Sequence, residues 1–149
     1  MANKNLVKNI KGFDQLRALL SQAETGREEY LYPQLNFGDV WWIPDSMTGF
    51  SNNRSRHPWV IVNGYRPHQI NIVACPRTSS YQRKEVKRGI LTSANILPGL
   101  EKEGLFVLKH RRTFSATQFH SFEYVGRLPE PLLQKIQDFY AELANGKIK

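Results

Sequence analysis

Short apolar segments separated by polar turns occupy the middle of the chain. They are rich in Val, Ile, Trp and Phe, which are residue types that favour β-strands. The predicted strands are Asp39 to Ile43, Trp59 to Asn63, Ile70 to Ala74, Glu85 to Leu91, Gly104 to His110 and Glu123 to Leu128. Short strands at this spacing are typical of a compact barrel, so the pattern predicts a mainly β fold.

The two ends of the chain show a helical periodicity instead. From Asn5 to about Glu29, apolar residues recur every three or four positions, which predicts an amphipathic helix. From Pro129 to Gly146, apolar residues again share one face, which predicts a C-terminal helix. The predicted organisation is a helical extension with its linker at residues 1–33 and a barrel domain with the C-terminal helix at residues 34–149.

The composition is that of a folded, soluble protein. Among the 149 residues, 40% are hydrophobic and 11% aromatic, which excludes a disordered chain. No apolar run approaches the roughly 18 residues that a membrane-spanning helix needs, and the N-terminus lacks the apolar core of a secretory signal. The lone cysteine, Cys75, lies in an apolar strand, which predicts a buried packing residue and a cytoplasmic protein.

The formal net charge of +8 changes the picture, because a chain this basic attracts phosphate backbones and other polyanions. Three basic clusters, made of Arg, Lys, His, Thr and Ser, lie at the ends of predicted strands. The first cluster is Arg54, Arg56 and His57; the second is Arg77, Thr78, Ser79 and Ser80; the third is Lys109, His110, Arg111, Arg112 and Thr113.

Each basic cluster alone has an ordinary interpretation as a turn or a solvated surface. Together they match the needs of metal-free RNA cleavage, which uses a base for the 2′-hydroxyl, an acid for the leaving oxygen and donors for the phosphorane charge. A barrel can bring strand ends to one rim, and exposed tryptophans there could stack on bases. Alternation places Trp41 and Trp42 on opposite faces, and Trp59 is predicted to lie in the core.

Other chemistries lack their motifs. The sequence contains no HExxH, CxxC, GxSxG or glycine-rich phosphate loop, and its four histidines are scattered along the chain. We therefore predict no metal site and no cofactor.

The order of the motifs resembles the MazF/PemK (Kid-type) family of toxins from toxin-antitoxin systems. The resemblance extends from Gly38 to Gly146. Its pieces are GDVWWIP, RHPWVIV after a polar loop, an apolar strand that runs into CPRTSS, GLFVLKHRRTF, and GRLPEPLLQKIQDFYAELANG. It implies an SH3-like barrel that forms a homodimer, a metal-independent endoribonuclease that cuts single-stranded RNA to a 2′,3′-cyclic phosphate and a 5′-OH, and inhibition by a cognate antitoxin.

The family's functional positions transfer only in part. The family's loop arginine before proline falls on His57, with Arg56 one place earlier, so either Arg56 acts as the phosphate clamp or His57 supplies a titratable group. The family's Thr or Ser after the next strand falls on Thr78. A catalytic Arg and Asp of Kid-like members fall on Val107 and Lys109, where this chain lacks both.

The resulting hypothesis is an endoribonuclease toxin with three catalytic residues, Arg56, His57 and Thr78. The predicted RNA-binding residues are Arg54, Arg77, Ser79, Lys109, His110, Arg111 and Arg112. Two alternatives stay open: a CcdB-like barrel that poisons a protein such as DNA gyrase, and a nucleic-acid-binding module without catalysis.

Overall fold

The structure is a computed structural model that describes residues 35–50, 55–64 and 71–147. The predicted N-terminal helix and the boundary at residue 33 lie outside this part of the chain, so both stay predictions. Within the described residues, no helix is long and apolar enough to span a membrane.

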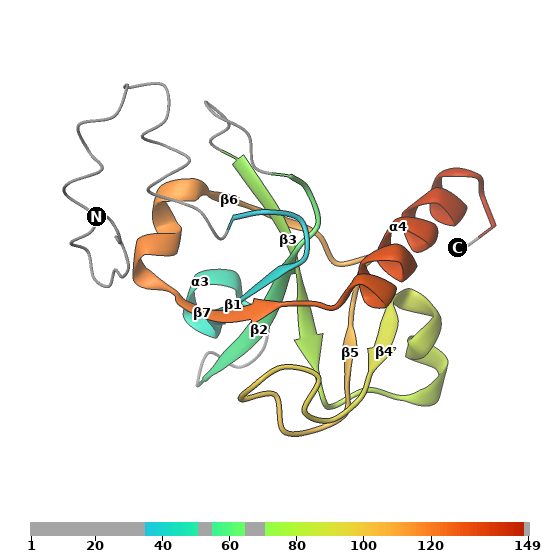
Figure 1. The fold of residues 1–149 in the computed structure, drawn as a ribbon, viewed down its shortest axis with the longest axis horizontal. Helices are drawn as coiled ribbons and strands as arrows, with labels where there is room; N and C mark the ends of the chain where they lie inside the picture. Colours follow the sequence, from blue (N-terminus) through green and yellow to red (C-terminus); the bar gives the residue numbers. More distant parts are fainter. Residues whose placement is uncertain (1–34, 51–54, 65–70, 148–149) are drawn as a thin grey trace. The chain divides into compact units, whose positions relative to one another are not determined.

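The described residues form one antiparallel sheet that curves into a half-barrel (Figure 1). Its strands are β1 (Asp39–Pro44), β2 (Arg56–Ile61), β3 (Asn71–Thr78), β4 (Ile90–Thr92), β5 (Gly104–Phe106), β6 (Arg112–Ser115) and β7 (Glu123–Arg127). The strand order is β4-β5-β3-β2-β1-β7, and β6 also pairs with β3. The predicted mainly β barrel is therefore confirmed.

Strand β3 joins the two parts of this sheet. Along one edge it pairs with β2, where Val60 lies opposite Cys75. Along the other edge its first half pairs with β6 and its last two residues, Arg77 and Thr78, pair with β5. As a result, the end of β3 that carries Thr78 pairs with β5, two residues beyond Pro76, where the pairing with β2 ends.

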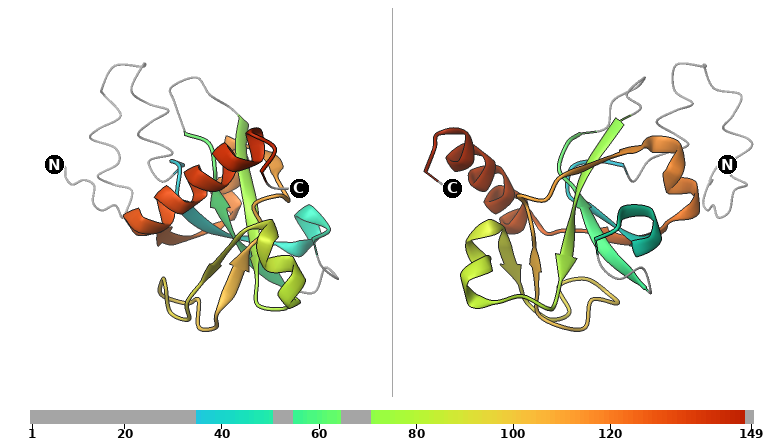
Figure 2. Two further views of the ribbon diagram at one scale, coloured as in Figure 1. Left: turned by 90° about the vertical axis from the view of Figure 1, so that its right-hand side faces the viewer. Right: turned by 180° about the vertical axis from the view of Figure 1, so that it is seen from behind.

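Among the described residues, four helical segments connect or cover the strands. They are α3 (Asp45–Thr48), the 3-10 helices η2 (Arg83–Arg88) and η3 (Ala116–Ser121), and α4 (Glu130–Ala144). Helix α4 confirms the predicted C-terminal helix and begins with Pro131 in its first turn, where a missing N–H costs no hydrogen bond. Figure 2 shows α4 from two further sides.

The apolar face of α4 covers the hydrophobic core. Its buried residues are Leu132, Leu133, Ile136 and Phe139. Strand residues Val40, Val60 and Phe106 belong to the same buried cluster. Gly38 has a φ of +94°, and a Cβ there would overlap the Leu133 side chain, so glycine lets the chain pass beneath α4.

Cys75 is buried in this core, as its apolar surroundings in the sequence predicted. Its Sγ lies 3.2 Å from the Tyr140 hydroxyl, which donates a 2.7 Å hydrogen bond to the Leu108 carbonyl. Burial raises the pKa of the Cys75 thiol to about 12, which leaves it protonated near neutral pH. The structure therefore favours a packing role for Cys75 over a nucleophilic one.

The prediction of a strand over Glu85 to Leu91 is wrong for most of its length. Residues Arg83–Arg88 form η2, and only Ile90–Thr92 forms a strand. The reason is local, because Gln82 and Glu85 form a capping box that stabilises a helical turn. The strand predicted from Gly104 to His110 ends at Phe106, and β6 and η3 were not predicted.

Candidate functional site

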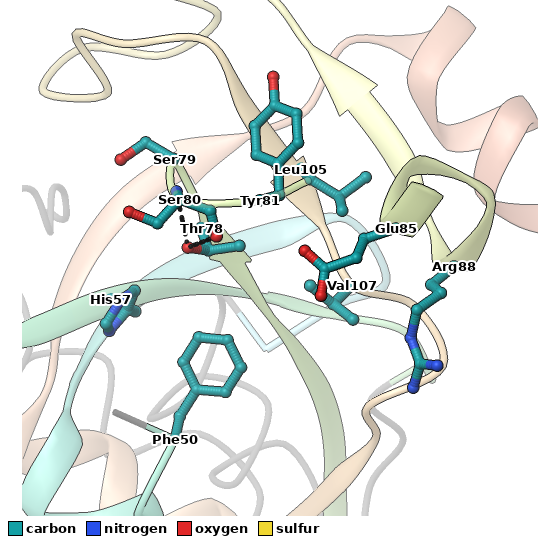
Figure 3. Close-up of a pocket in the computed structure, with 10 residues that line it drawn as sticks. All are labelled: Phe50, His57, Thr78, Ser79, Ser80, Tyr81, Glu85, Arg88, Leu105 and Val107. Carbon is teal, nitrogen blue, oxygen red and sulfur yellow. Dashed lines mark hydrogen bonds between the residues drawn. The ribbon is translucent and has the colours of Figure 1, made fainter. Parts of the chain in front are cut away.

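A cavity of about 460 Å³ opens where β2, β3 and β5 end near η2 (Figure 3). Its lining residues are Phe50, His57, Thr78, Ser79, Ser80, Tyr81, Glu85, Arg88, Leu105 and Val107. Figure 3 shows His57 at one end of the cavity and Arg88 at the other. The cavity thus brings together the predicted residues His57, Thr78 and Ser79, which come from the first and second basic clusters.

A second, shallower cavity of about 270 Å³ shares His57 and Ser79 with the first. Its charged lining residues are Arg56, Arg77, Glu101 and Lys102, and Trp42 contributes an aromatic ring. The two cavities are therefore adjacent, with His57 and Ser79 in the wall between them. A polymer strand that crosses this wall would place one unit in each cavity.

His57 is held by a carboxylate that the sequence analysis did not identify. The Nδ1 atom of His57 lies 2.6 Å from Oδ1 of Asp45, whose side chain is 0% exposed against 20% for His57. A carboxylate at this distance accepts a hydrogen bond from the ring nitrogen. His57 thus carries a buried acidic partner on one side and borders the cavities on the other.

The hairpin between β1 and β2 explains how Asp45 reaches His57. Ile43 pairs with His57 and Pro44 with Arg56, so the residue after β1 begins α3 next to the start of β2. The Asp45 N–H donates a 2.8 Å hydrogen bond to the Ser55 carbonyl, which fixes this turn. The polar loop that follows Pro44 in the sequence gave no sign of this contact, because it depends on the strand register.

Aromatic rings form the wall beside His57. The Phe50 ring packs edge-on against His57, with centroids 5.0 Å apart, and also against His110 at 5.2 Å. Trp59 lies behind them, fully buried, as predicted. These contacts restrict the orientation of the His57 ring.

Thr78 ends β3 at the edge of the larger cavity. Its hydroxyl oxygen accepts a 3.0 Å hydrogen bond from the Ser80 N–H and lies 3.2 Å from the Ser80 carbonyl. This turn fixes Thr78 at the rim while Ser79 remains exposed. A hydroxyl in this place can donate to a phosphate oxygen if its proton leaves the Ser80 carbonyl.

Arg56 lies at the surface beside the smaller cavity. Its guanidinium forms a 2.6 Å ion pair with Glu123 of β7 and stacks over the Trp42 ring at 4.4 Å. Because the ion pair is exposed, a phosphate can compete with Glu123 for this arginine at modest cost. Arg56 is therefore available as a phosphate contact.

Arg77 differs from the other predicted RNA-binding residues that the structure describes, because it is buried. Its Nε donates to the Thr92 hydroxyl at 2.9 Å, and its Nη2 donates to the Lys102 carbonyl at 2.8 Å. Burial lowers the pKa of this guanidinium. The bond to Lys102 connects β3 to the loop before β5. Arg77 therefore holds together the backbone segments that form the wall of the smaller cavity.

The third basic cluster lines neither cavity. Arg111 stacks over the Tyr140 ring of α4 at 5.2 Å, and Arg112 begins β6. Burial, followed by the charges of Arg112 and Arg88, lowers the pKa of His110. Lys109 follows β5 in a turn, and Arg54 of the first cluster lies outside the described residues. RNA binding by these residues stays a prediction.

In the described part of the chain, no three His, Cys, Asp or Glu side chains gather to form a metal site. The chemistry that the residues offer is a histidine with a buried carboxylate, hydroxyl donors and nearby arginines. These are groups for acid-base chemistry on an anionic substrate.

Comparison with known proteins identifies the fold. No family model and no curated protein matches the chain. Among solved structures, MazF (Form-I) from Deinococcus radiodurans matches with a TM-score of 0.53 and 16% identity, over 74% of this chain and 96% of that chain. The MazE-MazF complex (Form-II) from the same organism matches with a TM-score of 0.53 and 16% identity, over 73% of this chain and 93% of that chain. The chain therefore has a MazF-like fold, as the motif order indicated.

Proposed function

We propose that this protein is the toxin of a toxin-antitoxin pair and cleaves single-stranded RNA without a metal ion. One observation supports this proposal above the others: on a MazF-like barrel, His57 and Thr78 from adjacent strands line one cavity. The proposal also includes a homodimer and a protein antitoxin. The presence of MazE with MazF in the matched Deinococcus radiodurans crystals supports the antitoxin.

The proposed reaction is an internal transfer at the RNA phosphate. His57 takes the proton of a ribose 2′-hydroxyl, and the 2′-oxygen forms a bond to phosphorus. The bond from phosphorus to the 5′-oxygen of the next nucleotide breaks, and that oxygen takes a proton from solvent. The products are a 2′,3′-cyclic phosphate and a 5′-hydroxyl. The Thr78 hydroxyl donates to the phosphate oxygens and Arg56 offsets their charge.

The two adjacent cavities suit this reaction, since His57 lies in the wall that they share. The nucleotides on either side of the reacting phosphate would occupy one cavity each. Trp42 and Tyr81 offer rings on which bases could stack.

The full-length protein, purified with chelator present and assayed at low salt, is expected to cut a mixed-sequence RNA. The fragments should carry 5′-hydroxyl ends and cyclic phosphates, and mapping of cellular 5′ ends after induction should show the same sites. Intact RNA in both experiments would contradict the proposal. Growth arrest with intact RNA and accumulating DNA breaks would favour a protein-directed poison instead.

Arg56→Ala is expected to weaken binding of a non-cleavable 2′-O-methyl RNA about fivefold and to reduce the slope of log affinity against log salt by about one. The reason is the loss of one phosphate contact. Glu123→Gln should strengthen binding, because it frees the Arg56 guanidinium from its ion pair. Fluorescence anisotropy over a salt series measures both effects.

Lys135→Ala is the matched control, since it removes one positive charge from the exposed side of α4. Its binding should stay near that of the wild type. Equal losses for Arg56→Ala and Lys135→Ala would mean that RNA responds to net charge and not to this site.

A further inference from the structure

Burying the Asp45 carboxylate costs free energy, and packing alone does not explain why it is buried. Its side chain is fully buried, and among the described residues the Oδ2 atom has no hydrogen-bond partner. The Oδ1 atom contacts Nδ1 of His57 at 2.6 Å. Removing a carboxylate from water is costly unless it is paired, and here the pairing partner is a ring that borders the candidate site.

We infer that Asp45 is a positioning residue, which holds the His57 imidazole in the tautomer and orientation needed to take a proton from RNA. This inference rests on the proposed function, and it assigns a role to a residue to which the motif resemblance assigns none. In the position where that resemblance expects an arginine, this chain would use a histidine with its own buried carboxylate.

The tautomer follows from the chemistry of the contact. A carboxylate only accepts hydrogen bonds, so Nδ1 must carry the proton and the lone pair of neutral His57 must lie on Nε2. When Nε2 accepts a proton, the imidazolium that forms is stabilised by the adjacent Asp45 charge. A histidine without this partner would divide its population between two tautomers, one of which cannot act as a base at Nε2.

The orientation follows from three contacts on different elements. The β1–β2 ladder places His57 opposite Ile43, α3 supplies Asp45, and the Phe50 ring packs at 87° to the imidazole. The ring is thus held on one side by Asp45 and along one face by Phe50. The remaining part of the ring borders the two cavities.

Other charged groups around His57 also bear on its proton. Arg56 precedes it on β2, and His110 lies across the Phe50 ring. The titratable and charged residues that line the two cavities with it are Arg77, Tyr81, Glu85, Arg88, Glu101 and Lys102. Among the described residues, Asp45 is the acidic group in direct contact with the ring.

The test compares Asp45→Asn with the wild type in single-turnover RNA cleavage over a range of pH. We expect the maximal rate to fall at least 100-fold with little change in the RNA concentration at half-saturation, because an asparagine amide can favour the wrong tautomer. Asp45→Glu should restore part of the rate.

A double variant distinguishes a positioning role for Asp45 from a merely structural one. If Asp45 acts through His57, then in a His57→Ala background Asp45→Asn should add almost nothing to the loss of rate, because the two residues act as a unit. An additive loss in the double variant would overturn the inference. So would an Asp45→Asn protein that cleaves at the wild-type rate.

A second measurement does not depend on the folding of any Asp45 variant. In wild-type protein with nitrogen-15-labelled histidine, NMR should show His57 protonated at Nδ1 and unprotonated at Nε2 above the pH where it loses its charge. The His57 signals are identified as those that are missing from the spectrum of the His57→Gln variant. The opposite tautomer would overturn the inference while leaving RNA cleavage intact. Failure of the wild type to cleave RNA would instead overturn the proposed function and, with it, the role of Asp45.

Discussion

Replacing His57 with alanine is expected to lower the rate of RNA cleavage about 1,000-fold and to abolish growth arrest on induction. The magnitude is that of a general base, whose removal costs roughly 100-fold to 10,000-fold. His57 lies in the wall between the two cavities and contacts the buried Asp45 carboxylate, which suits it to the role of the base. Single-turnover cleavage of a defined RNA measures the effect.

Two further variants show what kind of role His57 has. His120→Ala removes the same side chain from η3, away from both cavities, and should leave the rate unchanged. His57→Arg introduces the residue that the family resemblance expects at this position. If His57 acts as a base, His57→Arg should be as slow as His57→Ala, because arginine stays protonated. Wild-type activity in His57→Arg would show that the position serves as a phosphate clamp.

Arg77→Ala is expected to lower the free energy of unfolding by about 3 kcal/mol. The substitution removes the hydrogen bonds from the guanidinium to the Thr92 hydroxyl and the Lys102 carbonyl, and hydrogen bonds to a charged group contribute roughly 1.5–3 kcal/mol each. It also opens a cavity next to Phe106, over whose ring the guanidinium lies at 5.8 Å. Urea unfolding, followed by tryptophan fluorescence in the His57→Ala background, measures the change without toxicity.

Arg112→Ala provides the comparison, because Arg112 is exposed on β6 and its removal should change stability by no more than about 0.5 kcal/mol. A larger loss of unfolding free energy in Arg77→Ala than in Arg112→Ala would show that Arg77 is a structural arginine and Arg112 a surface one. If Arg77→Ala unfolds at the wild-type urea concentration and loses RNA affinity, then Arg77 serves the RNA, as its place in the second basic cluster suggested.

The sequence was sufficient to predict a mainly β fold and several of its strands, but not η2 or β6. β1 and β2 were predicted with errors of a few residues, because their Val, Ile and Trp residues fit a pleated, half-buried surface. The strand ends that hold His57 and Thr78 do meet at one cavity. That outcome follows from antiparallel pairing, because the first residues of β2 lie beside the last residues of β3.

Other features depended on contacts that no local pattern contains. Asp45 and His57 are 12 residues apart, and only the β1–β2 register brings them together. Arg77 follows an apolar strand as Thr78 does, yet its side chain is buried while Thr78 is at the rim, because neighbouring residues on a strand face opposite ways. The third basic cluster lines neither cavity, and the charge of its residues in the sequence could not show where the cluster lies in the fold.

The double pairing of β3 has a consequence for substrate recognition. The strand has neighbours along both edges, so the Thr78 backbone is anchored by β5 before any RNA arrives. A donor that is already fixed loses little conformational entropy when the phosphate binds. If the protein binds RNA as proposed, preorganisation of this kind leaves most of the ordering cost to the flexible nucleic-acid strand.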